Sequence, residues 1–437
     1  MSEWRRGKIG DLAKGHRGVT YAAGQLLELH SPDSVTLLRS NNIRFGRLDY
    51  DDIQIVPKRL VTETQLMRDG DIAVCMSNGS KSLVGKAAAF FGGGAGKITV
   101  GAFCSIFRPE VGCVPEFVRQ LFQSGEYRKN LDLALAGSAI NNLRNRDLED
   151  FGCDVPPECE QRKIAVILGT IDTAIHETEA MIAKLKAVKQ GLLHDLLTRG
   201  IDANGELRRP QAEAPHLYKS SSLGWIPCEW TVRRLDACAS VAGGVTLGRD
   251  LAGPSSIELP YLRVANVQDG YFDLASVKQV RILTDEIERY KLMDGDVLMN
   301  EGGDYDKLGR GAVWRSQIEP CLHQNHVFRV RCDSSCLDAD FLAFYTASSG
   351  GKRFFLLSSK QSTNLASINL TQLKAFPIPC PELDEQQKIV AAVRSSERQA
   401  ESEELQLSSL RELKSGLMDD LLTGRVRVTP LLTDATA

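Results

Sequence analysis

Several sequence signatures are missing from this chain, and each absence excludes a class of protein. No run of 18 or more apolar residues is present, which excludes an ordinary membrane-spanning helix. The N-terminal stretch is polar and lacks the apolar centre of a secretory signal, so we expect a cytoplasmic protein with no membrane partner. The 11 cysteines are scattered without a Cys-x-x-Cys pair, which argues against a disulfide framework.

Motifs of common catalytic sites are also missing. There is no Gly-x-x-x-x-Gly-Lys-Ser/Thr phosphate loop, and the glycine-rich residues 92–96 lack its Lys-Ser/Thr end. Gly-x-Ser-x-Gly, His-Glu-x-x-His and the Asp/Asn-Pro-Pro-Tyr/Phe motif of amino-methyltransferases are absent. His323 and His326 form one His-x-x-His pair without a cysteine or acidic partner at ligand spacing, so we interpret them as ordinary polar residues. We therefore expect no catalytic residue, metal site or cofactor in this chain.

The formal net charge is −3, from 53 basic and 56 acidic residues. This balance argues against a protein that holds nucleic acid through a general positive field. It leaves room for a protein that uses local basic clusters and shares its hold on DNA with a partner.

The most informative feature present is an internal repeat. The sequence LKAVKQGLLHDLLT at 185–198 returns as LRELKSGLMDDLLT at 410–423, an offset of 225 residues. The same offset relates residues 160–164 to 385–389, and the Asp-Gly-Asp at 69–71 to that at 294–296. A repeat of this length is a whole domain with a helix, so we expect two similar binding faces that can hold two copies of one partner about a pseudo-two-fold axis.

Each repeat begins with about 150 residues of short apolar runs separated by turn signals such as Asp-Gly. Helical stretches follow at 115–127 and 338–348. This pattern predicts an α+β fold with two repeated mixed α/β domains.

A long helix follows each of these domains. From Ile164, alternating spacings of four and three residues select ten positions, of which eight are apolar. The matching positions of the second helix are weaker, with Ser396 and Glu403 among them. A seam longer than five heptads is too long for one such domain, so we expect the helices to pair with each other; packing of each helix only on its own domain is the alternative. The predicted seam comprises Ile164, Leu168, Ile171, Ile175, Ile182 and Leu185, with Leu407, Leu410, Leu417 and Leu421.

These patterns predict six segments along the chain. They are a first domain at 1–158, a helix at 159–200, an irregular and partly mobile linker at 201–222, a second domain at 223–383, a helix at 384–425 and a frayed tail at 426–437.

Three sequence segments together indicate a family. Residues 196–201 read LLTRGI, residues 223–230 read LGWIPCEW, and residues 378–389 read IPCPELDEQQKI. In this order they resemble the specificity subunit of type I restriction-modification enzymes, with two target recognition domains and two conserved helical regions, over nearly the full length. The entry to the first helix departs from the family pattern, because residues 156–161 read PPECEQ instead of Pro-Glu-Leu-x-Glu-Gln.

The resemblance implies a non-catalytic subunit in which each target recognition domain reads one half of a split sequence in double-stranded DNA. It also implies that the long helices pair as an antiparallel coiled coil that sets the distance between the half-sites. Two methyltransferase (modification) subunits would dock on the assembly, with restriction/translocase subunits for cleavage. S-adenosylmethionine, ATP and Mg²⁺ would belong to those partners.

Two polar loops in each repeat carry the side chains that a sequence reader needs. The first loop follows the Asp-Gly-Asp turn and ends at Gly85-Lys86 or Gly309-Arg310, where a basic residue beside glycine suits a close phosphate contact. The second loop precedes the long helix. The candidate DNA-binding residues are Asn78, Ser80, Lys81, Lys86, Asn141, Asn142, Arg144 and Arg146 in the first repeat, and Asp304, Lys307, Arg310, Lys360, Gln361, Ser362, Thr363 and Asn364 in the second.

Two other functions fit parts of the sequence. One is a self-sufficient methyltransferase-nuclease fusion, which the missing motifs oppose. The other is a protein-only adaptor that keeps the architecture but no longer reads DNA. In that case the polar loops would be ordinary solvated loops.

Overall fold

The computed structural model describes residues 4–44, 46–92, 96–136, 141–248, 251, 253–303, 308–361 and 366–433. The chain has a mixed α/β fold and forms two compact units. Unit 1 contains Met1–Ala180 and Glu403–Ala437, and unit 2 contains Met181–Ser402. Each unit therefore combines one domain with segments of both long helices.

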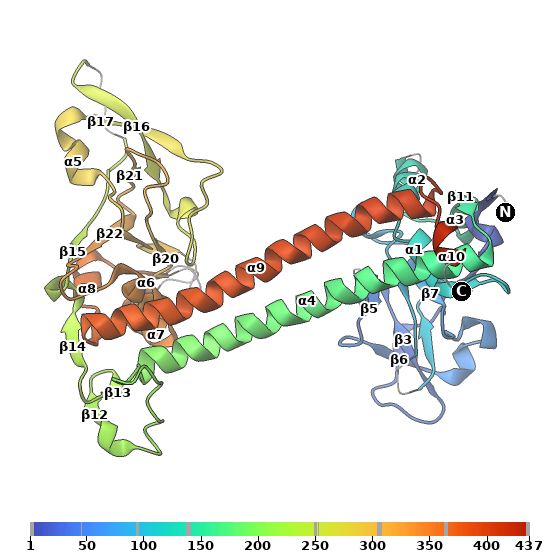
Figure 1. Cartoon of the computed structure of the whole chain (residues 1–437), viewed down its shortest axis with the longest axis horizontal. Helices are drawn as coiled ribbons and strands as arrows, with labels where there is room; N and C mark the ends of the chain where they lie inside the picture. Colours follow the sequence, from blue (N-terminus) through green and yellow to red (C-terminus); the bar gives the residue numbers. More distant parts are fainter. Residues whose placement is uncertain are drawn as a thin grey trace. The chain divides into compact units, whose positions relative to one another are not determined.

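Unit 1 holds eleven described strands and four short helices (Figure 1). The strands are β1 Arg5–Lys8, β2 Ala13–Arg17, β3 Ser34–Leu38, β4 Ile43–Arg44, β5 Arg47–Leu48, β6 Gln54–Pro57, β7 Ile72–Cys75, β8 Ala87–Ala89, β9 Ile98–Val100, β10 Cys104–Pro109 and β11 Gly152–Val155. The helices are α1 Pro115–Leu121, α2 Gly125–Ala136, α3 Asn145–Glu149 and α10 Pro430–Thr433.

Unit 2 follows the same plan with its own strands and short helices. The strands are β12 Tyr218–Ser221, β13 Gly224–Pro227, β14 Thr231–Arg234, β15 Ala239–Ala242, β16 Ser256–Leu262, β17 Lys278–Leu283, β18 Val297–Asn300, β19 Gly302–Gly303, β20 Gly311–Val313, β21 Leu322–His323, β22 Val327–Cys332, β23 Lys360–Gln361, β24 Ala366–Ser367 and β25 Pro377–Cys380. The helices are α5 Ile287–Tyr290, α6 Ala339–Ala347, α7 Ser349–Ser358 and α8 Leu370–Lys374.

The main sheets of the two units have the same topology. The order β2-β10-β7-β8 in unit 1 matches β15-β22-β18-β20 in unit 2, and β6-β3-β9 matches β17-β16-β21. Each three-stranded sheet contains one parallel pair, β3 with β9 and β16 with β21. The two units therefore share the strand order of their main sheets, in agreement with the repeat in the sequence.

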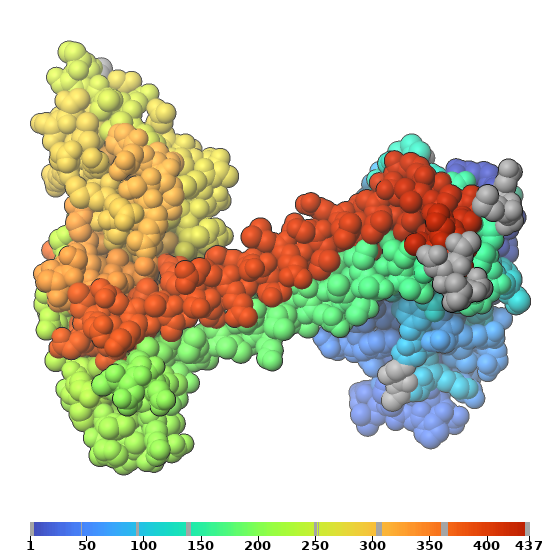
Figure 2. All heavy atoms as spheres, viewed as in Figure 1, coloured from blue at the N-terminus to red at the C-terminus, as the bar shows by residue number. Residues whose placement is uncertain are grey.

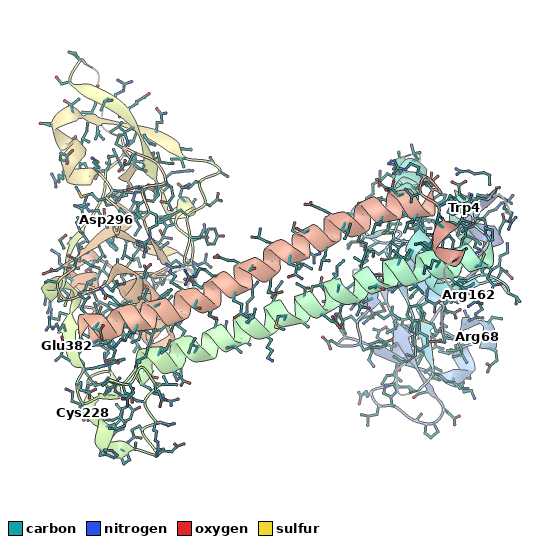
Figure 3. All side chains as sticks on the ribbon, in the orientation of Figure 1. Trp4, Arg68, Arg162, Cys228, Asp296 and Glu382 are labelled. Carbon is teal, nitrogen blue, oxygen red and sulfur yellow. The ribbon has the colours of Figure 1, made fainter. Side chains whose placement is uncertain are left out.

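The Asp-Gly-Asp motif makes the same turn in both units. Gly70 has a left-handed φ of 85°, and Asp71 accepts the backbone N–H of Arg68 while binding the Arg108 guanidinium. Gly295, with φ of 83°, and Asp296 repeat this arrangement with Arg331. In Figure 3, Asp296 is labelled inside the domain of unit 2. A left-handed turn followed by a buried carboxylate explains why the motif recurs.

The two long helices are α4 Glu158–Thr198 and α9 Leu383–Leu422, close to the predicted ranges 159–200 and 384–425. No helix in the described part of the chain is long and apolar enough to cross a membrane.

Each hydrophobic core is completed by the start of one long helix and the end of the other. In unit 1, Ile164 and Leu168 near the start of α4 share a buried cluster with Met418, Leu421 and Leu422 of α9. Figure 2 shows the C-terminal residues of α9 in red against the other residues of unit 1.

In unit 2, Ile389 and Val393 near the start of α9 share the core with Leu196 and Leu197 of α4. The Leu-Leu-Thr repeat therefore marks the place where a helix end enters a domain core.

The segment expected to be an irregular, mobile linker at 201–222 is instead packed into unit 2. Tyr218 is buried, and β12 pairs with β13 across the predicted boundary at residue 222. The described part of the tail, 426–433, also differs from the expected frayed segment, because Val428 is buried and residues 430–433 form α10. The proline and charged residues of these segments predicted mobility. In the structure, Arg208 and Tyr218 attach the linker to unit 2, and Val428 attaches the start of the tail to unit 1.

Candidate nucleic-acid interface

The two polar loops predicted for the first repeat meet in unit 1. Ser77 forms a β-bridge with Asn142, and the Asn78 backbone N–H donates to the Asn141 carbonyl at 3.3 Å. The Asn141 side-chain amide donates to the Gly79 carbonyl at 3.2 Å. Backbone pairing thus brings two segments more than 60 residues apart into one polar surface.

The corresponding loops of unit 2 meet in the same register. Gly302 of β19 pairs with Ser367 of β24, and this pair lies at an offset of 225 from Ser77 and Asn142. Of the candidates here, Arg310 is described, and Lys360 and Gln361 are described as strand β23. Asp304, Lys307, Ser362, Thr363 and Asn364 lie outside the described residues.

The exposed candidates in unit 1 are Asn142 and two further pairs of residues. Ser80 and Lys81 lie on the exposed first loop, where the Asn78 side-chain oxygen accepts the Ser80 N–H. Arg144 and Arg146 have side chains more than four-fifths exposed, at 83% and 85%.

The two arginines pair with neighbouring carboxylates on the surface. Arg144 pairs with Asp147 at 2.8 Å and Arg146 with Asp150 at 3.6 Å. The hydrogen bond from Arg144 lowers the pKa of Asp147. Exposed pairs of this kind contribute little to stability, so either arginine can exchange its carboxylate for a phosphate at small cost.

Lys86 and Arg310 point to a third segment that the sequence did not single out. Lys86 donates to the Ser40 carbonyl at 3.0 Å, and Arg310 donates to the Gln268 side chain at 3.5 Å. Both acceptors lie just beyond the first strand of the three-stranded sheet, at the turn that Asn42 or Asn266 stabilises by accepting a backbone N–H. The matching Asn42 and Asn266, 224 residues apart, were the available signal for this segment.

The glycines beside these basic residues also have a packing role. Gly85 and Gly309 have left-handed φ values of 79° and 70°. A Cβ atom at Gly85 would lie 2.4 Å from Leu131, and one at Gly309 would lie 2.3 Å from Phe355. A helix packs against each glycine, α2 through Leu131 and α7 through Phe355, so a side chain at either position would clash with the core.

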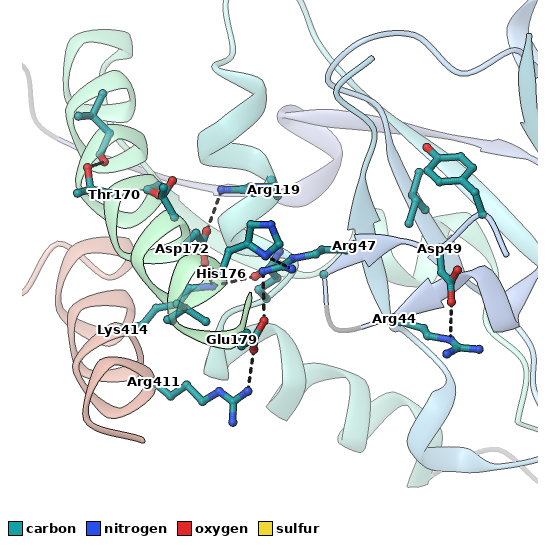
Figure 4. A pocket seen from close by; sticks show the side chains of 18 of the residues that line it. Arg44, Arg47, Asp49, Arg119, Thr170, Asp172, His176, Glu179, Arg411 and Lys414 are labelled. Carbon is teal, nitrogen blue, oxygen red and sulfur yellow. Dashed lines mark hydrogen bonds and ion pairs between the residues drawn. The ribbon is translucent and has the colours of Figure 1, made fainter. Parts of the chain in front are cut away.

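A groove of about 1550 Å³ in unit 1 lies between the β4–β5 hairpin and the long helices (Figure 4). Arg47 of the hairpin contacts His176 at 2.5 Å and Glu179 at 3.5 Å, both on α4. Arg411 of α9 donates to the same Glu179 at 2.8 Å. Glu179 thus joins an arginine of the hairpin to an arginine of α9, and these ion pairs link the hairpin to the helices.

The predicted helix seam lies on the covered side of both helices. All ten seam residues are buried or half-buried, whereas other apolar residues of α4 and α9 are exposed, namely Val166, Met181, Val188, Leu405 and Leu413. Within unit 1, Lys414 pairs with Asp172 at 2.7 Å, and within unit 2, Lys189 pairs with Glu397 at 2.7 Å. Lys189 and Lys414 occupy matching seam positions, 225 residues apart, and within each unit the two helix segments run antiparallel.

The Glu-Gln pair at each helix start has two separate structural roles. Glu160 accepts the Trp4 indole at 3.2 Å and binds Arg427, whose hydrogen bond lowers the pKa of Glu160. Figure 3 shows Trp4 at the α4 start. Gln161 accepts the Val114 N–H that begins α1 and donates to the Pro156 carbonyl.

Unit 2 repeats this arrangement. Glu385 binds Arg208 and Trp230, and it accepts the backbone N–H of Ile201 at 2.8 Å. Gln386 accepts the Asp338 N–H at the start of α6. The motif therefore fastens each long helix to its domain.

The two histidines of the His-x-x-His pair do not act together. His323 is buried and contacts the Val327 carbonyl at 2.7 Å, while His326 pairs with Glu301 at 2.6 Å. Among the described residues, no group of three or more His, Cys, Asp or Glu side chains is arranged to hold a metal ion.

The repeated α/β units, each with a pair of polar loops and segments of two long helices, define a duplicated α/β-plus-helix protein. Residues 227–410 match the family described as type I restriction modification DNA specificity domain. The chain is 28% identical over 431 residues to the StySPI specificity subunit of Salmonella potsdam, covering 97% of this chain and 88% of that one. It is 26% identical over 420 residues to the EcoKI specificity subunit of Escherichia coli K12, covering 94% and 86%.

The chain has the same fold as a solved structure whose description concerns complex assembly and conformational transition of the type I R-M system. The TM-score is 0.57 at 15% identity, covering 98% of this chain and 99% of that one. The chain is therefore similar to type I restriction-modification specificity subunits over nearly its full length, and residues 227–410 match the specificity-domain family.

Proposed function

We propose that this chain is the DNA-reading subunit of a type I restriction-modification complex, in which each unit reads one half of a two-part target. The observation that carries this proposal is the repeated junction of the two polar loops. The pairs Ser77–Asn142 and Gly302–Ser367 occupy equivalent backbone positions and carry different side chains. A shared scaffold with different side chains is what two unlike half-sites require.

Contacts to DNA divide by chemistry. Asn78, Asn141 and Asn142 offer the amide groups that recognise base edges, whereas Lys81, Arg144 and Arg146 offer charge to phosphates. The net charge of −3 gives no general attraction to DNA. Specific binding is therefore expected only when partner subunits add their own contacts.

The long helices would act as an antiparallel coiled coil that fixes the spacing of the half-sites. The buried seam residues and the ion pairs Lys189–Glu397 and Lys414–Asp172 support this assignment. A charged residue at a seam position that finds its partner in one register disfavours other registers.

The partners follow from the duplication. Two repeats offer two equivalent sites for two methyltransferase subunits, and restriction/translocase subunits would join for cleavage. S-adenosylmethionine, ATP and Mg²⁺ are assigned to those partners. This chain is assigned no catalytic step.

Co-expression with the cognate methyltransferase subunit, followed by sequencing of the methylated genome, tests the proposal. A single two-part methylated motif is expected, and Asn141→Ala combined with Asn142→Ala should relax only one half of it. Asn204→Ala, on an exposed turn of unit 2, is the matched control. Methylation by this chain alone would favour the methyltransferase-nuclease fusion. Assembly with no sequence preference would favour the protein-only adaptor.

A further inference from the structure

Two thiols lie opposite each other in the central sheet of unit 1. Cys75 of β7 is the register partner of Cys104 of β10, and both side chains are buried. The Cys75 N–H donates to the Lys86 carbonyl at 2.9 Å, and its carbonyl accepts the Gly85 N–H at 2.7 Å. Both backbone groups of Cys75 thus face away from β10.

Cys75 and Cys104 are therefore directly opposite each other on neighbouring strands, at a position where the two residues share no backbone hydrogen bond. In such pairs the Cα atoms are about 4.5 Å apart and the side chains approach closely. A disulfide accepts Cα separations from about 4.4 Å. Cys75 and Cys104 can be joined without separating the strands.

The pKa values of the two thiols are shifted in opposite directions. The hydrogen bond with Cys104, together with the nearby Lys86 ammonium, lowers the pKa of Cys75. The same hydrogen bond, with burial, raises the pKa of Cys104. Because the thiolate is the nucleophile, Cys75 is the attacking group and Cys104 the resolving group.

Cys75 lies directly beneath the candidate interface. Its thiol donates to the Ser77 carbonyl at 3.6 Å, and Ser77 forms the bridge to Asn142 that joins the two polar loops. In unit 2 the equivalent register pair is Asn300 with Val327, so the shared fold does not require thiols at this place. The dithiol is a property of unit 1.

We propose that Cys75 and Cys104 form a reversible dithiol–disulfide site that adjusts the polar loops of unit 1. The oxidant is a small disulfide of the glutathione type. The Cys75 thiolate attacks one of its sulfurs and releases one thiol, and Cys104 then attacks the mixed disulfide at Cys75 and releases the second. One protein disulfide forms, two molecules of reduced thiol leave, and the Cys75 hydrogen bond to Ser77 is lost. The oxidation stands on the thiol geometry alone, whereas its effect on DNA rests on the proposed function.

The test treats the folded full-length chain with oxidised glutathione, blocks the remaining thiols and maps linked peptides by mass spectrometry. A Cys75–Cys104 link is expected in the wild type and in Cys153→Ser, which removes another buried thiol of unit 1. Cys75→Ser and Cys104→Ser should lose this link. A link that appears only after denaturation, or none in the folded chain, would overturn the site.

The second measurement compares DNA binding by the complex before and after oxidation, on a duplex with the methylated motif. Losing one hydrogen bond at the loop junction should weaken binding by about fivefold. Dithiothreitol should restore binding, and Cys104→Ser should not respond to the oxidant. Equal affinity of the linked and reduced forms would refute the adjustment of the loops. Absence of sequence preference in the reduced complex would instead refute the proposed function, while the peptide result still decides the thiol site.

Discussion

His323 and His326 are three residues apart, and their surroundings make them behave differently. Burial lowers the pKa of His323 from 6.5 to about 4, and its Nε2 atom is buried without a hydrogen-bond partner in the structure. His326 is exposed beside Glu301. The pair that resembles a zinc motif therefore contains one core histidine and one surface histidine.

This difference predicts a pH dependence of stability. The unfolded chain takes up a proton at position 323 near pH 6.5, whereas the native state does so only near pH 4, so the unfolded state binds more protons between these values. The free energy of unfolding should fall as the pH is lowered through this window, by up to about 3 kcal/mol. Denaturant titrations of His323→Asn and of His326→Asn check this. Only His323→Asn should lose this change of the free energy of unfolding with pH. An equal pH dependence in both variants would contradict the assignment to His323.

Gly85 gives a second prediction at the residue scale. Gly85→Ala places a side chain in a left-handed conformation and against Leu131, so it should lower the free energy of unfolding by more than about 1 kcal/mol. Gly79→Ala is the control, because a Cβ there meets nothing within 4 Å. Chemical denaturation measures both variants. A stable Gly85→Ala variant with weakened DNA binding would instead support a phosphate contact at this glycine.

At the scale of elements, the long helices were the most predictable part of the chain. Their apolar spacing and repeated motifs placed both helices within three residues of their observed ends. The structure differs from the predictions of a mobile linker and a frayed tail. Single anchors such as Arg208 and Val428 decide whether a polar segment packs against a domain. Those contacts join residues far apart in sequence, and local composition does not contain them.

The loops show the same limit. Their polar composition was readable, yet the bridge of Ser77 to Asn142 and the role of Ser40 beside Lys86 depend on the folded sheet.

The seam makes a prediction about the paired helices. Ile175 is buried at 9% exposure, so Ile175→Asp buries a carboxylate without a partner and should cost several kcal/mol, about 3 to 5. Met181→Asp, on an exposed position of the same helix, should have little effect. Light scattering during titration with methyltransferase subunits should show impaired assembly for the first variant only. Normal two-to-one assembly by Ile175→Asp would reject the coiled-coil assignment.

At the scale of the whole molecule, the proposed ruler can be lengthened. Inserting seven residues at Thr178 and seven at the equivalent Glu403 keeps the seam in phase and adds about 10 Å of helix. That length equals roughly three base pairs, so the spacer in the methylated motif should grow by that amount. Genome-wide methylation sequencing reads the spacer directly. An active complex with an unchanged spacer would eliminate the ruler.

The exchange of helix ends has a genetic consequence. The core of unit 1 uses Leu421 and Leu422 from the second repeat, and the core of unit 2 uses Leu196 and Leu197 from the first. A gene interrupted soon after codon 200 would encode a single repeat that carries a leucine pair able to complete another copy of itself. Such a truncated product should be found as a homodimer by analytical ultracentrifugation, with two identical half-sites in inverted orientation. The present chain would then be the fused descendant of a symmetric ancestor, free to let its two halves diverge.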